Sequence, residues 1–167
     1  MKAGSSQVKS VKAGTAPGIA VLGHGLTLLD TPDDTDNGFF LWECSTPAGG
    51  GVPPHSERNH EAFYVLEGTF EIEADGSLFS CAPGDFLGVA PGVVHSFRNL
   101  GPGWARMLTI VSPGSQHQRF FEALGEPLEP GALPAPLAGP PDFERVASVG
   151  RDSGIDFLPP EEAAVDD

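Results

Sequence analysis

Short apolar segments separated by glycine and proline recur along this chain, and no other feature constrains its fold as strongly. The chain has 22 glycines and 17 prolines among 167 residues, so turns are frequent and long helices are disfavoured. We predict strands over residues 20–29, 39–46, 62–67, 69–74, 78–82, 86–90, 93–98 and 105–112. Strands this short and this evenly spaced indicate an all-β fold, either an antiparallel sandwich or a barrel.

The C-terminal third has a different pattern. Residues 115–124 are predicted to form a helix with Ser115 as its N-cap and Gly125 as its stop, and a second helix is expected to start near Pro141 and Asp142. We therefore divide the chain into a flexible N-terminal arm (1–19), a barrel (20–113), a C-terminal helical extension (114–158) and an acidic tail (159–167).

The charge balance excludes several classes of partner. Nine Lys plus Arg face 23 Asp plus Glu, a net charge of −14, which disfavours binding to nucleic acids and to anionic membranes. Apolar runs are too short to span a bilayer, and residues 1–18 lack the apolar stretch of a secretory signal. Cys44 and Cys81 have no C-x-x-C spacing, so we expect reduced, buried thiols in a cytoplasmic protein.

Two segments, 51–68 and 84–99, place histidine and carboxylate side chains in a strand context. Side chains alternate along a strand, so His55 and Glu57 point the same way. A turn at residues 58–59 is expected to reverse the chain and bring Glu61 onto a neighbouring strand. If these faces and that of His95 line one barrel interior, the four side chains converge, and imidazoles with carboxylates suit a divalent first-row transition metal.

The two segments resemble the paired motifs of the cupin family. The first motif, G-x(5)-H-x-H-x(3 or 4)-E-x(6)-G, matches at His55, Glu61 and Gly68, and the second, G-x(5)-P-x-G-x(2)-H-x(3)-N, matches at Gly84, Gly92, His95 and Asn99. The proline of the second motif is displaced by one position, to Pro91. The surrounding residues are similar to small single-domain cupins described as quercetin 2,3-dioxygenase-like, over roughly residues 20–113. The resemblance implies a cupin double-stranded β-helix, a jelly-roll barrel with short C-terminal helices.

One departure from the motif leaves the ligand set open. Glu57 stands where the family has its second histidine. Glu57 could be a ligand, giving two imidazoles and two carboxylates. It could instead lie outside the ligand shell, leaving His55, Glu61 and His95, which suffice for non-haem iron. A third reading is a site without metal, in which the same residues hold a polar ligand.

The other histidines are not expected to be ligands. His60 precedes Glu61, so on a regular strand it faces the opposite way, although strand alternation can fail at a turn. His24 and His117 lie outside both motifs. Phe63 and Phe97 share faces with Glu61 and His95 and could line an apolar pocket.

These observations favour a metal-dependent enzyme acting on a small organic molecule. The cofactor would be a divalent ion (Fe, Mn, Ni, Cu or Zn), and Glu61 is the candidate for both ligand and proton acceptor. Resemblance to quercetinases implies dioxygenation of an enol or flavonol-like substrate. A non-oxidative isomerase, cyclase or lyase and a non-catalytic ligand-binding protein remain alternatives. We expect a homodimer, the commonest symmetric assembly.

Overall fold

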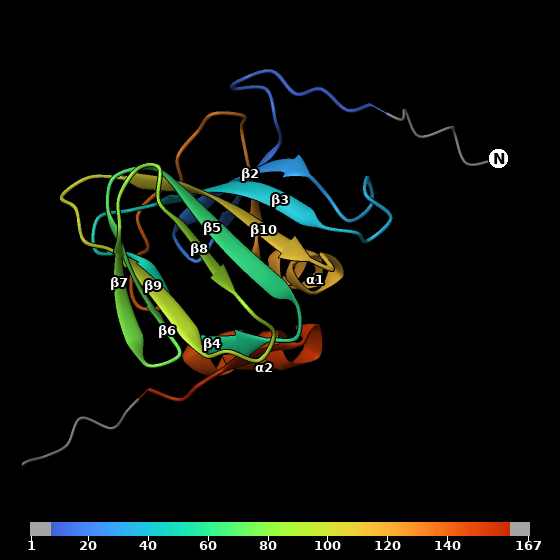
Figure 1. Cartoon of the computed structure of the whole chain (residues 1–167). Coiled ribbons are helices and arrows are strands. Elements are labelled where there is room, and N and C mark those ends of the chain that lie inside the picture. The colour runs from blue at the N-terminus through green and yellow to red at the C-terminus, as the bar shows by residue number, and fades with distance from the viewer. Residues whose placement is uncertain (1–7, 161–167) are drawn as a thin grey trace, which may run out of the picture.

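The computed structural model describes residues 8–160 and places twelve strands in two facing antiparallel sheets (Figure 1). The seven-stranded sheet has the order β11-β1-β2-β3-β10-β5-β8, and the five-stranded sheet has the order β12-β4-β9-β6-β7. The strands are β1 (Gly18–Val21), β2 (His24–Asp30), β3 (Phe40–Thr46), β4 (Gly51–Glu57), β5 (His60–Glu67), β6 (Phe70–Ala74), β7 (Ser77–Cys81), β8 (Phe86–Val89), β9 (His95–Asn99), β10 (Ala105–Ser112), β11 (Glu126–Leu128) and β12 (Ile155–Phe157).

The core lies between the two sheets and follows the alternation of side chains. In β10, Ala105, Met107, Thr109 and Val111 are buried while the residues between them are less buried. The inner face of the facing sheet contributes Phe70 and Ile72, both fully buried. This arrangement confirms the all-β prediction and the jelly-roll barrel.

The turn at residues 58–59 differs from the prediction. We expected it to reverse the chain onto a neighbouring strand, but β4 pairs with β9 and β12, whereas β5 pairs with β10 and β8. The chain therefore crosses from one sheet to the other at this corner. As a result, Glu61 faces His55 and Glu57 across the barrel interior and does not lie beside them in one sheet.

The C-terminal extension is bonded to both sheets. Helices α1 (Ser115–Leu124) and α2 (Phe143–Ser153) lie together beside the barrel (Figure 1), as predicted for both segments. Between and after them, β11 pairs with β1 and β12 pairs with β4. Neither of these two strands was predicted, so the extension contributes strands as well as helices.

The helix ends confirm most of the predicted caps. The N-cap of α1 is Gly114 and has no side-chain hydrogen bond, so the assignment of Ser115 was wrong by one residue. Gly125 ends α1, as expected. The Asp142 side chain accepts a hydrogen bond from the Arg145 backbone N–H and caps α2.

The structure describes only part of the predicted N-terminal arm and of the predicted acidic tail. Residues 1–7 of the N-terminal arm and residues 161–167 of the acidic tail lie outside the described residues. Residues 18 and 19, assigned to the arm, belong to β1. Within residues 8–160, no helix is long and apolar enough to cross a membrane.

Candidate metal centre

Four buried side chains gather at one end of the barrel interior: His55, Glu57, Glu61 and His95. One ligand atom from each can be chosen so that all four lie within 4.8 Å of one another. These are the four residues that the sequence predicted to converge. Histidine and carboxylate groups this close together form a donor set for a divalent metal ion.

Strand register explains this convergence. His55 on β4 is directly opposite His95 on β9, and Glu57 lies two residues further along the same face of β4. Glu61 enters from β5 in the other sheet, where Phe63 and Val65 follow it on the inward face. Because the chain crosses between the sheets at residues 58–59, Glu57 and Glu61 enter the cluster from opposite sides of the barrel.

Backbone carbonyl groups fix the orientation of both histidines. Nδ1 of His55 lies 2.9 Å from the Pro53 carbonyl oxygen, and Nδ1 of His95 lies 2.9 Å from that of Val93. A carbonyl can only accept, so each Nδ1 carries a hydrogen and donates it. In the neutral ring, the lone pair is then on Nε2, the atom that each ring directs at the carboxylates. Burial, and then His95, lower the pKa of His55 to about 4, so its ring is neutral at pH 7.

The two carboxyl groups lie in different protonation environments. Burial, and then the neighbouring Glu57 carboxylate, raise the pKa of Glu61 well above its ordinary range. Burial acts the same way on Glu57, but the His117 imidazole and the neighbouring Glu61 outweigh it and lower the pKa of Glu57. Nε2 of His95 lies 2.7 Å from Oε2 of Glu61.

Glu57 provides the test of whether a metal ion fits. Both of its carboxylate oxygens are buried and have no hydrogen-bond partner among the described residues. Imidazole nitrogens of His117, His95 and His55 lie 3.1, 3.7 and 3.9 Å from these oxygens, but none of them makes a hydrogen bond to Glu57. A buried carboxylate without donors is costly unless a cation compensates it. The residues present therefore fit a divalent ion held by His55, Glu57, Glu61 and His95.

His117 on α1 is a fifth member of the cluster, which the sequence reasoning missed. Its Nε2 lies 3.1 Å from Oε2 of Glu57 and 4.0 Å from Oε1 of Glu61. The amide nitrogen of Asn59 donates to the Pro113 carbonyl at 3.0 Å and lies 3.3 Å from Nδ1 of His117. Because that amide can only donate, Nδ1 accepts and the hydrogen of the neutral ring is on Nε2. His117 thus presents an N–H to Glu57, where His55 and His95 present lone pairs.

The remaining histidines lie apart from the four donors. His60 is exposed, as its parity predicted. His24 is buried, and its two ring nitrogens lie 3.1 Å from the Thr46 hydroxyl and the Gly51 carbonyl oxygen. Burial lowers the pKa of His24.

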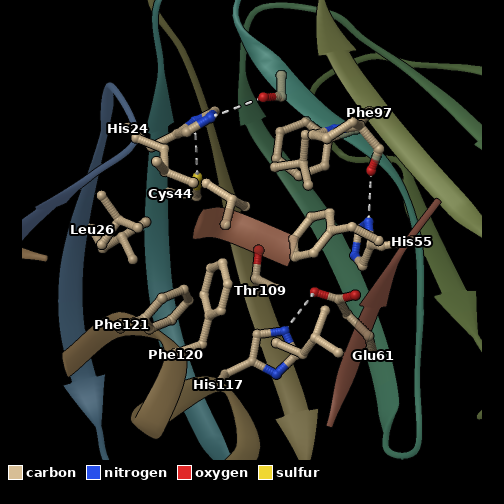
Figure 2. Close-up of a pocket in the computed structure, with 18 of the residues that line it drawn as sticks. His24, Leu26, Cys44, His55, Glu61, Phe97, Thr109, His117, Phe120 and Phe121 are labelled. Atoms are coloured by element: carbon tan, nitrogen blue, oxygen red, sulfur yellow. Dashed lines mark hydrogen bonds and ion pairs between the residues drawn. The ribbon is translucent and has the colours of Figure 1, made fainter. Parts of the chain in front are cut away.

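An apolar cavity of about 290 Å³ extends from the cluster into the barrel (Figure 2). Its wall includes Phe63 and Phe97, the two residues expected to line a pocket. His55, Glu61 and His117 line it at the cluster end, whereas Glu57 and His95 are not part of its wall. The C-terminal extension contributes several further apolar residues: Phe120, Phe121, Pro141, Phe143, Val146, Ile155 and Phe157.

Comparisons with known proteins agree with this architecture. A family model described as "Cupin domain" matches residues 42–111. Quercetin 2,3-dioxygenase of Bacillus subtilis (strain 168) is 35% identical over 102 residues, which are 60% of this chain and 30% of that protein. The chain thus matches less than a third of that relative's length.

Two solved structures support the fold alone. An RmlC-like cupin from Shewanella frigidimarina NCIMB 400 superposes with a TM-score of 0.58 at 21% identity, covering 68% of this chain and 96% of that one. A predicted oxalate decarboxylase from Thermotoga maritima superposes with a TM-score of 0.58 at 19% identity, covering 63% and 99%. The chain therefore has the fold of cupins and is similar to the cupin domain over residues 42–111 and, over 102 residues, to a quercetin 2,3-dioxygenase.

Proposed function

We propose that this protein is a metal-dependent enzyme that acts on a small organic molecule, with dioxygenation of an enol or flavonol-like compound as its reaction. The observation that carries the proposal is the buried cluster itself, which adjoins an apolar cavity and in which both Glu57 oxygens make no hydrogen bond within the described residues. The likeness to a quercetin 2,3-dioxygenase supports the choice of reaction.

The side chains have separate roles in this proposal. A divalent ion held by His55, Glu57, Glu61 and His95 would supply Lewis-acid and oxygen chemistry. Glu61 lines the cavity and Glu57 does not, so Glu61 is the carboxylate that meets a bound molecule. Its ionised form would accept the proton of an enol hydroxyl. The apolar wall holds the ring and excludes water.

Metal analysis tests the first part of the proposal. Purified protein is expected to contain stoichiometric metal by mass spectrometry, and His55→Ala and His95→Ala are expected to lose it. His60→Ala is the matched control, because His60 is exposed and outside the cluster. A folded wild-type protein that stays metal-free after exposure to each candidate ion would overturn the proposal.

Oxygen uptake tests the reaction. The metal-loaded protein is expected to consume oxygen in proportion to an added enol substrate and to stop under strict anaerobiosis. Turnover that continues without oxygen would instead favour an isomerase, cyclase or lyase. The second carboxylate favours that alternative, because Glu57 in place of a histidine adds a group that can hold a proton. Metabolite binding without metal or turnover would favour a non-catalytic binding protein.

Location and assembly complete the proposal. Cys44 and Cys81 are free and buried, which supports a reducing, cytoplasmic environment. Tyr64 on β5 and Phe86 on β8 are paired across the sheet and exposed, which supports a homodimer formed over this face. Light scattering that gives a monomer mass at micromolar concentration would contradict the dimer.

A further inference from the structure

One polar side chain of the cavity wall has no partner. Thr109 on β10 is 2% exposed, and its hydroxyl makes no hydrogen bond within the described residues. It lies on the inward face of the strand and points into the cavity (Figure 2). A buried hydroxyl without a partner costs about 1–3 kcal/mol, which valine, its isostere, would avoid. A polar atom of a bound molecule would give this hydroxyl the partner that the described residues do not.

The strand register gives the spacing of Thr109 and Glu61 along the inner face of the sheet. Thr109 is opposite Phe63 on β5, and Glu61 precedes Phe63 by two residues on the same inward face. Two residues along a strand span about 7 Å. A molecule with one polar atom at Glu61 can therefore place a second polar atom at Thr109 when about the width of one ring separates the two atoms.

The cavity also limits the size and charge of its occupant. A dry apolar cavity of about 150 Å³ holds one benzene ring. At about 290 Å³, this cavity has room for two rings. Its wall, within the described residues, contains no lysine or arginine to neutralise an anionic sugar or a dicarboxylate. The lining is instead dominated by phenylalanine and aliphatic side chains.

We infer that the substrate is an uncharged, flat compound of about two fused rings with polar groups at opposite ends. One hydroxyl oxygen meets the metal centre beside Glu61, and the second polar group forms a hydrogen bond with Thr109. This inference rests on the proposed function and narrows its substrate class. It makes Thr109 a specificity-determining residue outside the four proposed metal ligands.

A binding experiment with two probes tests this assignment. The protein is loaded with zinc, which is redox-inert, and titrated with 1-naphthol and with naphthalene-1,5-diol, whose second hydroxyl is on the far ring. Wild type is expected to bind the diol about 5-fold more tightly than 1-naphthol, the equivalent of one ordinary hydrogen bond. Thr109→Val is expected to abolish that preference while binding 1-naphthol as wild type does. Thr109→Ser is expected to retain the preference.

The outcomes separate this inference from the proposed function. Zinc stoichiometry and thermal stability of Thr109→Val are expected to match or exceed those of wild type, so misfolding is detected directly. An unchanged diol preference in Thr109→Val, or no binding of either probe to wild type, would overturn the assignment. If zinc-free protein binds both probes as tightly as zinc-loaded protein but Thr109→Val still loses the preference, the metal proposal fails and the Thr109 assignment stands.

Discussion

The cavity places a buried histidine at each end, but the surroundings of the two differ. His24 donates from Nε2 to the Gly51 carbonyl and accepts at Nδ1 from the Thr46 hydroxyl, so both nitrogens are satisfied by neutral groups. At the other end, His55 donates from Nδ1 to the Pro53 carbonyl but turns Nε2 toward Glu57. A buried histidine is therefore not a metal ligand in itself.

The carboxylates make the difference between the two ends. Burial lowers the pKa of both His24 and His55, so both rings are favoured in the neutral form that binds metal. Of the two, only His55 has buried carboxylate oxygens nearby, and those of Glu57 make no hydrogen bond within the described residues. Burial of a histidine ring therefore does not identify the metal site. The site is identified by the Glu57 oxygens, which make no hydrogen bond within the described residues, beside the free lone pair on Nε2 of His55.

Exchanging the histidine at each end for glutamine is expected to give the largest contrast. His55→Gln removes one of four donors, so metal affinity should fall by more than about 100-fold, beyond what outer-shell partners contribute. His24→Gln should leave metal affinity within about two-fold of wild type but lower stability by about 1–3 kcal/mol, because buried partners lose their hydrogen bonds. Competition with a chromophoric chelator measures the first effect and urea unfolding the second. Metal loss in His24→Gln with an intact fold would contradict the prediction that, of these two histidines, only His55 binds the metal.

Acid sensitivity of the metal-free protein gives the next largest effect. Unfolded His55 takes up a proton near pH 6.5, whereas the folded protein delays this to about pH 4. Between these values the unfolded state binds more protons, so stability falls as pH falls, by about 3 kcal/mol from this group. The lowered pKa of His24 likewise makes stability fall as pH falls.

Comparison with His55→Gln separates the contribution of His55 to the pH dependence of stability from the contributions of the carboxyl groups. Urea unfolding at pH 7 and pH 4 should show wild type losing about 3 kcal/mol more than His55→Gln. Repeating the pair with His24→Gln shows how much the other end contributes. Equal losses in wild type and His55→Gln would mean that burial of this ring does not control the acid response.

The sequence predicted the parts of the fold that have local signals. Glycine and proline bound most strands, and alternation placed His55, Glu57, Glu61 and His95 on inward faces. In contrast, β11 and β12 have three residues each, too few to show a period, and form only because β1 and β4 offer them free edges. The turn at residues 58–59 was predicted to bring Glu61 onto a neighbouring strand, because sequence alone does not show which sheet receives the next strand.

His117 was missed for a related reason, although a signal was present. Together with Phe120, Phe121 and Leu124 it follows the i, i+3, i+4, i+7 pattern of a helix face. That pattern predicts that His117 faces the core. It does not predict that the helix packs against the end of the barrel where Glu57 lies, since that contact depends on the tertiary path of the extension.

Replacing His117 gives the smallest of the expected effects and tests how far the site extends beyond its four donors. His117→Phe keeps an aromatic ring at this position but removes the N–H that lies 3.1 Å from Glu57. Metal affinity should fall about 10- to 100-fold, the range for groups that orient a ligand without binding the ion. Asn59→Leu should shift affinity in the same direction, because Asn59 holds the hydrogen of His117 on Nε2. Unchanged affinity in both variants, with wild-type stability, would confine the metal centre to the residues of the two motifs.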